Sequence, residues 1–173
     1  WDRIIKTQNQ EIAAYGRAHC IQLGSTVTAM IVFEDGKYLI GHVGDSRAYK
    51  ISNSEISILT KDQTIVANEV RLGKLTPEEA ARDPRRNVLL QCVGASRIVE
   101  PEYVGGTVEL GACYMLCSDG FRHEISAAEI QNAFAPIANR DAAQMQTNII
   151  RLIELNKSRG ETDNITALLI KVC

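Results

Sequence analysis

The chain has 173 residues, a length that suits one domain, and 45% of them are hydrophobic, which is enough for a sizeable core. Lys and Arg number 19 and Asp and Glu 21, so the net charge is −2, with no basic block. This charge disfavours nucleic acid and anionic membranes as partners. No apolar run reaches the roughly 20 residues of a transmembrane helix, so we expect no membrane span.

The cysteines indicate a reducing compartment. They are odd in number, form no Cys-x-x-Cys pair and mostly lie in apolar runs, where cysteine behaves as a small hydrophobic residue. The chain also lacks the charged start and apolar segment of a signal peptide. We therefore expect a cytoplasmic protein whose thiols stay reduced.

Residues 1–22 are predicted to form a helix, because Ile4, Ile12 and Tyr15 recur at helical spacing and Gly24 follows as a stop signal. The chain begins inside this pattern without an initiator Met, so we expect a piece of a longer protein. Four strand-like runs joined by tight turns come next and predict an antiparallel meander, at 25–34, 37–44, 46–52 and 55–60.

Residues 62–83 change to helical composition, and Thr76 before Pro77 is typical of a capped helix start, so two short helices are predicted. Beyond them we expect strands at 87–94, 103–110 and 113–117, helices at 126–135 and 140–157, and a closing strand at 165–173. This order favours an α+β fold, a largely antiparallel sheet or pair of sheets flanked by helices.

The segment MLCSDGF at 115–121 has two interpretations. Asp119-Gly120 between apolar runs is typical of a hairpin turn. The residues that follow look helical, however, with Ser126 and Glu129 spaced as in a capping box. A strand that leads into a helix weakens the hairpin interpretation, and the alternative is a carboxylate placed to hold a ligand.

Asp119 is one of three aspartates at predicted strand ends, with Asp45 after Gly44 and Asp163 before the closing strand. If these ends converge, the carboxylates would suit Mg²⁺ or Mn²⁺, which prefer oxygen ligands. Zinc is disfavoured, because the histidines are scattered and no Cys pair joins them. Spacing alone leaves open that each aspartate only forms a turn or a cap.

Five segments in this order carry a family resemblance: GSTVTAMIV, HVGDSRAYKI, LTPEEAARDPRRNVLLQCVG, YMLCSDGF and TDNITALLI. Over residues 24–173 the chain resembles the bacterial type of the metal-dependent protein phosphatase 2C family. The resemblance implies one domain over 1–173 that lacks its N-terminal strands. The implied fold is a sandwich of two antiparallel sheets in α-β-β-α layers, with a flap-like helical insert at 62–86.

The resemblance also implies the chemistry. Asp119 and Asp163 would bind one of two catalytic Mn²⁺ or Mg²⁺ ions, and Asp45, with Asp119, a weaker third ion. These ions would activate water to hydrolyse phosphoserine and phosphothreonine in proteins. The implied partners are phosphoproteins and a Ser/Thr kinase that the phosphatase opposes. The alternative is a pseudophosphatase, a non-catalytic regulatory module with the same fold.

The chain departs from the family in what lies upstream of it and at two internal places, at His123 and at Asp62-Gln63-Thr64, where Asp-His-Ser is common. The other metal ligands, the phosphate-binding Arg and the general-acid His would lie upstream of residue 1, so we expect weak metal binding, little hydrolysis, and pairing between copies through exposed sheet edges. His123 stands where the family commonly has Asp, and it is a ligand for a softer ion, a substitute for a water-bridged contact, or a solvated residue at a helix start. Arg47, Arg85 and Arg86 are candidates for phosphate contact or for ion pairs.

Overall fold

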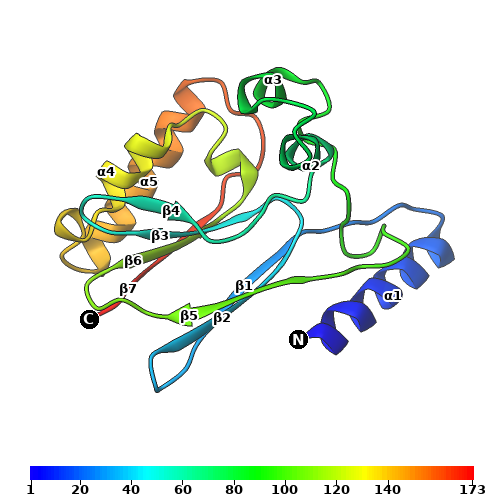
Figure 1. Ribbon diagram of the computed structural model, residues 1–173, viewed down its shortest axis with the longest axis horizontal. Helices are drawn as coiled ribbons and strands as arrows, with labels where there is room; N and C mark the ends of the chain where they lie inside the picture. Colours follow the sequence, from blue (N-terminus) through cyan, green and yellow to red (C-terminus); the bar gives the residue numbers. More distant parts are fainter. The chain divides into compact units, whose positions relative to one another are not determined.

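A computed structural model describes all 173 residues. The chain divides into two compact units. The first consists of Trp1–Ala29, Gly41–Asp45 and Lys61–Tyr103, and the second of Met30–Ile40, Ser46–Thr60 and Val104–Cys173. Figure 1 follows the elements along the chain. No helix combines the length and the apolar character that crossing a bilayer requires.

The strands form a three-stranded sheet of order β1-β2-β5 and a four-stranded sheet of order β4-β3-β6-β7. Their bounds are β1 Val27–Val32, β2 Lys37–Val43, β3 Arg47–Ile51, β4 Ile56–Ile58, β5 Glu102–Thr107, β6 Cys113–Cys117 and β7 Ala167–Lys171. The predicted four-strand meander is therefore wrong, since β2 and β3 belong to different sheets. The chain leaves the first sheet at Gly44, whose φ of 110° interrupts the extended backbone.

The strand predicted at 87–94 is also absent. Only isolated bridges form in this segment, one from Val93 to Ser25 and one from Leu89 to Thr64. The Gln91 side chain bonds to both backbone groups of Glu100. Its amide nitrogen donates to the Glu100 carbonyl and its amide oxygen accepts from the Glu100 N–H, both at 2.8 Å. Of its apolar residues, Val93 packs in the unit's core, whereas Val88 and Leu90 are 45% and 49% exposed, so the apolar composition does not mark a strand.

In the first unit, helix α1 (Asp2–His19) confirms the predicted N-terminal helix. Its Ile5 packs in a small core whose other buried members are Val43, Val93 and Val99. The buried Asn9 of α1 accepts a hydrogen bond of 2.7 Å from the Gly94 N–H and donates one of 3.0 Å to the Ser96 carbonyl. A buried side chain with both groups bonded in this way ties α1 to the loop at 94–96.

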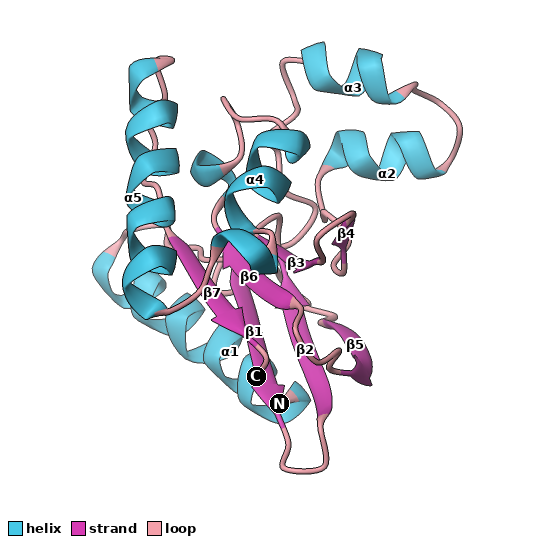
Figure 2. Ribbon diagram, turned by 90° about the vertical axis from the view of Figure 1, so that its left-hand side faces the viewer, coloured by secondary structure: helices cyan, strands magenta, loops and turns pink.

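The predicted helical insert forms as α2 (Ile65–Arg71) and α3 (Pro77–Arg82), which lie side by side in Figure 2. The α3 start is the predicted one: the Thr76 hydroxyl accepts from the Glu79 N–H at 3.2 Å, and the Glu79 carboxylate accepts from the Thr76 N–H at 2.8 Å. The structure thus confirms the two helices, and a flap function for 62–86 stays a prediction.

The second unit contains the larger core. Helices α4 (Ala127–Phe134) and α5 (Ala142–Ser158) lie together on one side of the four-stranded sheet (Figure 1). Alternate residues of β3 and β6 face them, as the period of two in a strand requires, and they form one core with side chains from the helices: Tyr49, Ile51, Cys113, Met115, Cys117, Ile130, Phe134 and Leu152. Two short 3₁₀ turns complete the unit, η1 (Asp119–Phe121) and η2 (Pro136–Ala138).

Candidate metal centre

Asp119 and Gly120 do not form a hairpin. β6 ends at Cys117, and after Ser118 the residues Asp119–Phe121 make the single 3₁₀ turn η1 on the way to α4. One carboxylate oxygen of Asp119, Oδ1, accepts a hydrogen bond of 2.8 Å from the Gly120 N–H. The turn therefore projects a half-buried carboxylate from the end of a core strand, as the ligand interpretation expected.

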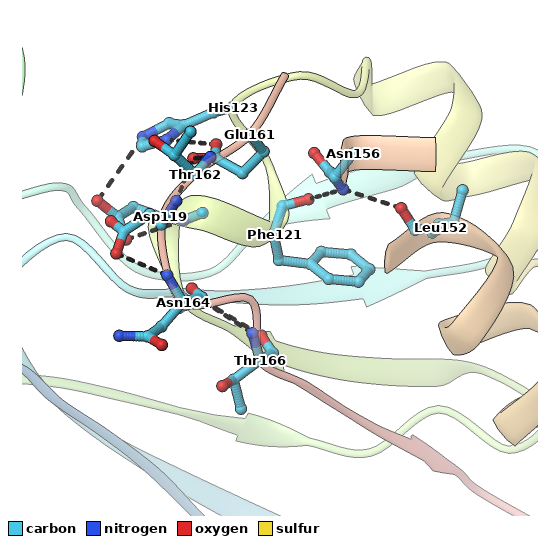
Figure 3. Close-up of polar contacts among 12 residues, drawn as sticks. Asp119, Phe121, His123, Leu152, Asn156, Glu161, Thr162, Asn164 and Thr166 are labelled. Carbon is cyan, nitrogen blue, oxygen red and sulfur yellow. Dashed lines mark hydrogen bonds and ion pairs between the residues drawn. The ribbon is translucent and has the colours of Figure 1, made fainter. Parts of the chain in front are cut away.

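Ser118 ties the end of β6 to the residues that precede β7. Its N–H donates to the Thr166 carbonyl at 3.0 Å, and its hydroxyl oxygen accepts from the Thr166 N–H at 3.1 Å. The same hydroxyl donates to the Asn164 carbonyl at 3.2 Å. Figure 3 shows Asn164 and Thr166 beside the Asp119 turn. These bonds hold together two segments that are distant in the sequence, since Ser118 and Asn164 are 46 residues apart.

Gly120 allows the two segments to meet closely. A Cβ at this position would lie 2.7 Å from the Asn164 carbonyl oxygen and 3.2 Å from the Asp163 Cβ, so only glycine fits. Asp163 thus lies directly against the turn that carries Asp119. Its Oδ1 accepts from the Asn164 N–H at 2.7 Å, and its Oδ2 accepts no hydrogen bond within the chain.

These residues fit part of a centre for a hard divalent ion. Two carboxylates come from adjacent strand ends, and each has one oxygen bonded by the amide of the next residue. Mg²⁺ and Mn²⁺ are commonly held by one or two carboxylates, with waters as the remaining ligands. No three His, Cys, Asp or Glu side chains are grouped so as to hold a metal ion. Asp119 and Asp163 would therefore be two ligands of a larger set.

The third predicted ligand, Asp45, belongs to the first unit, and a role in ion binding stays a prediction. The residue follows β2 and is 7% exposed. Its neighbour Gly44 is held on both sides by Gln63: the Gly44 N–H donates to the Gln63 side-chain oxygen and the Gln63 N–H donates to the Gly44 carbonyl, both at 2.8 Å. A Cβ on Gly44 would collide with the side chain of Thr26. The backbone at Asp45 is thus well constrained.

His123 lies in a polar cluster with two carboxylates, so the interpretation as a solvated residue is wrong. Its side chain is 17% exposed. The ring nitrogen Nδ1 lies 3.0 Å from Glu161 Oε2, and Nε2 lies 3.7 Å from Asp119 Oδ2 (Figure 3). The ring therefore stands between the Asp119 turn and the loop before β7.

Glu161 is a functional candidate that the sequence reasoning missed. Its side chain is 7% exposed, and its Oε1 accepts from the N–H groups of Thr162 and Asp163, both at 2.8 Å. Burial acts to raise the pKa of Glu161, but the backbone hydrogen bonds from Asp163 and Thr162, with the contact to His123, lower the pKa below its usual value. An acid two residues before Asp163, directly after Gly160, was the signal available in the sequence.

Two of the candidate arginines are held by side chains of the protein. Arg85 donates to Glu69 Oε2 at 2.8 Å and to Asp83 Oδ2 at 2.7 Å, which raises its pKa and confirms the ion-pair interpretation. The side chain of Arg47 donates to the Tyr49 hydroxyl at 3.2 Å, an internal contact. Arg86 is exposed, and a contact of its side chain with phosphate stays a prediction.

His42, next to the end of β2, is buried as a neutral ring. The Lys61 carbonyl lies 3.1 Å from its Nε2 and can only accept, so Nε2 carries the proton and Nδ1 accepts from the Thr28 hydroxyl at 2.9 Å. Burial lowers the pKa of His42 below the ordinary 6.5, although the Glu102 carboxylate acts in the opposite direction.

We expect the free energy of unfolding to fall as the pH drops below 6.5, because the unfolded His42 takes up a proton that the folded one excludes. The slope has an upper limit of about 1.4 kcal/mol per pH unit for one proton. Urea unfolding midpoints from about pH 8 to pH 5 measure it. The variant His42→Gln should lose this part of the slope, whereas an unchanged slope would contradict the assignment.

Known proteins share both the sequence pattern and the fold. No family model matches the chain. The chain is 32% identical over 167 residues to a protein phosphatase 2C-type protein of Streptococcus pyogenes. The aligned region covers 96% of this chain and 65% of that protein. The chain therefore spans just under two thirds of the length of this curated relative.

Two solved structures extend the comparison. The catalytic domain of the serine/threonine protein phosphatase PstP, in complex with two manganese ions, matches with a TM-score of 0.82 and 30% identity over 99% of this chain and 70% of that chain. The serine/threonine phosphatase Stp1 from Staphylococcus aureus matches with a TM-score of 0.87 and 26% identity, over 99% of this chain and 66% of that chain. The predicted α+β class, antiparallel sheets with flanking helices, is confirmed. The chain belongs to the protein phosphatase 2C family of serine/threonine phosphatases.

Proposed function

We propose that this chain is part of the catalytic domain of a metal-dependent protein serine/threonine phosphatase, in which Asp119 and Asp163 bind Mn²⁺ or Mg²⁺. The observation that carries the proposal is the close approach of the turn that bears Asp119 to the segment that bears Asp163, which the lack of a side chain on Gly120 permits. The two solved structures named above support it, since both are serine/threonine phosphatases and one holds two manganese ions.

The residues of this chain would hold and orient the ions. Asp119 and Asp163 each offer a carboxylate at a strand end, Ser118 keeps the two ends together, and Asp45 is proposed to bind a further ion with Asp119. When bound, two divalent ions supply Lewis-acid chemistry that activates water and offsets the charge that develops on phosphoryl oxygens. No covalent intermediate on the protein is required.

The proposed substrates are phosphoserine and phosphothreonine proteins, including a Ser/Thr kinase and its targets. The insert at 62–86 would act as a flap that influences which phosphoprotein is accepted. A cytoplasmic location is part of the proposal, supported by five cysteines that form no disulfide. We further propose that the 173 residues alone hydrolyse little and that copies associate through sheet edges, because the chain spans only part of the length of its relatives.

The test is hydrolysis of p-nitrophenyl phosphate during a Mn²⁺ titration. It compares this chain with the polypeptide encoded by its complete reading frame. We expect Mn²⁺-dependent activity in the longer polypeptide and a loss of at least about 100-fold in Asp119→Asn, more than outer-shell partners of a metal usually cost. The matched control is Asp35→Asn, in an exposed turn, which should keep full activity. No activity in either polypeptide would overturn the proposal and favour a regulatory module.

A further inference from the structure

His123 is oriented by Glu161 and faces Asp119. Nδ1 is 3.0 Å from Glu161 Oε2, within hydrogen-bond distance, whereas Nε2 is 3.7 Å from Asp119 Oδ2, beyond it (Figure 3). Asp119 is in η1, His123 lies shortly after it, and Glu161 is in the loop before β7. The ring therefore connects the two segments that supply the proposed metal ligands.

The hydrogen bond to Glu161 determines which ring nitrogen can bind a cation. An ionised carboxylate only accepts, so Nδ1 carries the proton that it donates to Glu161. In the neutral ring, Nε2 then presents a lone pair on the side of Asp119. Two ligand atoms that each lie about 2.1 Å from one cation are separated by up to about 4 Å. The observed 3.7 Å between Nε2 and Oδ2 lies between the roughly 3.0 Å of adjacent ligands and the roughly 4.2 Å of opposite ligands around an octahedral ion, so the ring or the Asp119 turn would shift slightly on binding, in keeping with the lack of a preformed three-ligand group.

Glu161 is itself firmly held, so it can set the ring orientation. It is almost fully buried and accepts from the backbone N–H groups of Thr162 and Asp163 through Oε1, while Oε2 faces His123. A histidine that ligates a metal typically donates its other N–H to a carboxylate in this manner. The same carboxylate therefore fixes the backbone at Asp163 and the imidazole beside Asp119.

We propose that His123 Nε2 is an additional ligand of the cation that Asp119 binds, with Glu161 as the positioning residue, and that this nitrogen makes the centre favour Mn²⁺ over Mg²⁺. Imidazole suits transition-metal ions, whereas Mg²⁺ prefers oxygen ligands throughout. The inference rests on the proposed function, because it concerns the ion bound at Asp119. It assigns to His123 and Glu161 a role in choosing the metal.

The experiment is Mn²⁺ and Mg²⁺ titration by calorimetry, together with pulsed electron paramagnetic resonance of bound Mn²⁺ to detect coupling to a directly bound ¹⁴N. Both polypeptides of the phosphatase assay are used. We expect ¹⁴N coupling in the unmodified protein and its loss in His123→Ala, with Mn²⁺ affinity at least about tenfold weaker. His123→Asp should bind without ¹⁴N coupling and shift the preference toward Mg²⁺. Glu161→Gln should weaken Mn²⁺ binding about tenfold.

The controls are His19→Ala and Glu154→Gln, at exposed positions on α1 and α5, which should leave affinity and coupling unchanged. Mn²⁺ binding that requires Asp119 but shows no ¹⁴N coupling, or that keeps its Mn²⁺ to Mg²⁺ ratio in His123→Asp, would overturn this inference and leave the proposed function intact. Failure of Mn²⁺ to bind through Asp119 in either polypeptide would overturn both.

Discussion

In the polypeptide encoded by the complete reading frame, the substitution Gly120→Ala is expected to abolish most of the proposed metal-dependent phosphatase activity and to destabilise the fold. The added Cβ would lie 2.7 Å from the Asn164 carbonyl oxygen, and backbone cannot move aside as a flexible side chain can. The turn carrying Asp119 must then shift away from Asp163. A displacement of about 1 Å at a catalytic centre costs roughly 100-fold in rate. Overpacking of this kind typically lowers the free energy of unfolding by about 1–3 kcal/mol.

Steady-state hydrolysis with Mn²⁺ and urea unfolding together measure the effect of Gly120→Ala. The matched control is Gly105→Ala in β5, where the added Cβ would meet only the Tyr38 carbonyl oxygen, at an ordinary 3.6 Å. Gly105→Ala should keep both its activity and its free energy of unfolding. Full activity and unchanged stability in Gly120→Ala would show that the two segments do not meet as described.

The substitution Phe121→Ala is expected to cost about 3–5 kcal/mol of the free energy of unfolding, the usual range for truncating a buried Phe. The side chain is fully buried and stacks on Phe134 of α4, with ring centroids 6.1 Å apart and planes 17° apart. Its removal leaves a cavity between the sheet and α4. The free energy of unfolding of native domains is about 5–15 kcal/mol, so the loss is a large fraction of the total.

Phe121 also belongs to the turn that presents Asp119, so weaker Mn²⁺ binding should accompany the lost stability. The backbone of this turn is anchored by Asn156 of α5, whose side-chain nitrogen donates to the Phe121 carbonyl at 2.8 Å (Figure 3).

Thermal and urea unfolding test the predicted loss of stability in Phe121→Ala. Phe121→Leu should cost less, about 1.5 kcal/mol. The control Ile150→Ala, 51% exposed on α5, should change stability by less than about 0.5 kcal/mol. Equal effects of Phe121→Ala and Ile150→Ala would contradict the assigned core.

Local chemistry made several elements predictable. The capping box of α4 and the Thr76 cap of α3 form as expected, because Ser126 bonds with Glu129 three residues on, and Thr76 accepts from the Glu79 N–H within one helical turn. The periodic apolar residues likewise identified α1 and the core strands β3 and β6. These features depend on neighbours along the chain.

The predictions that failed depend on contacts between distant segments. Gly44 and Asp45 look like an ordinary turn, yet the chain changes sheets there. The segment 87–94 has strand composition, but only two isolated bridges form there, and Val88 and Leu90 are exposed. Strand composition does not report which strand, if any, lies beside a segment.

The type of chemistry can be predicted from local sequence: aspartates stand beside Gly or Asn at strand ends, and they are the acids that a hard divalent ion prefers. Which of these residues meet depends on how the chain folds. The turn that bears Asp119 lies against Asp163 because Ser118 joins the end of β6 to the segment before β7 and Gly120 leaves room for it. His123 meets Glu161 across 38 residues of sequence for the same reason. Such pairs arise from strand pairing and packing over long separations, which no local pattern encodes.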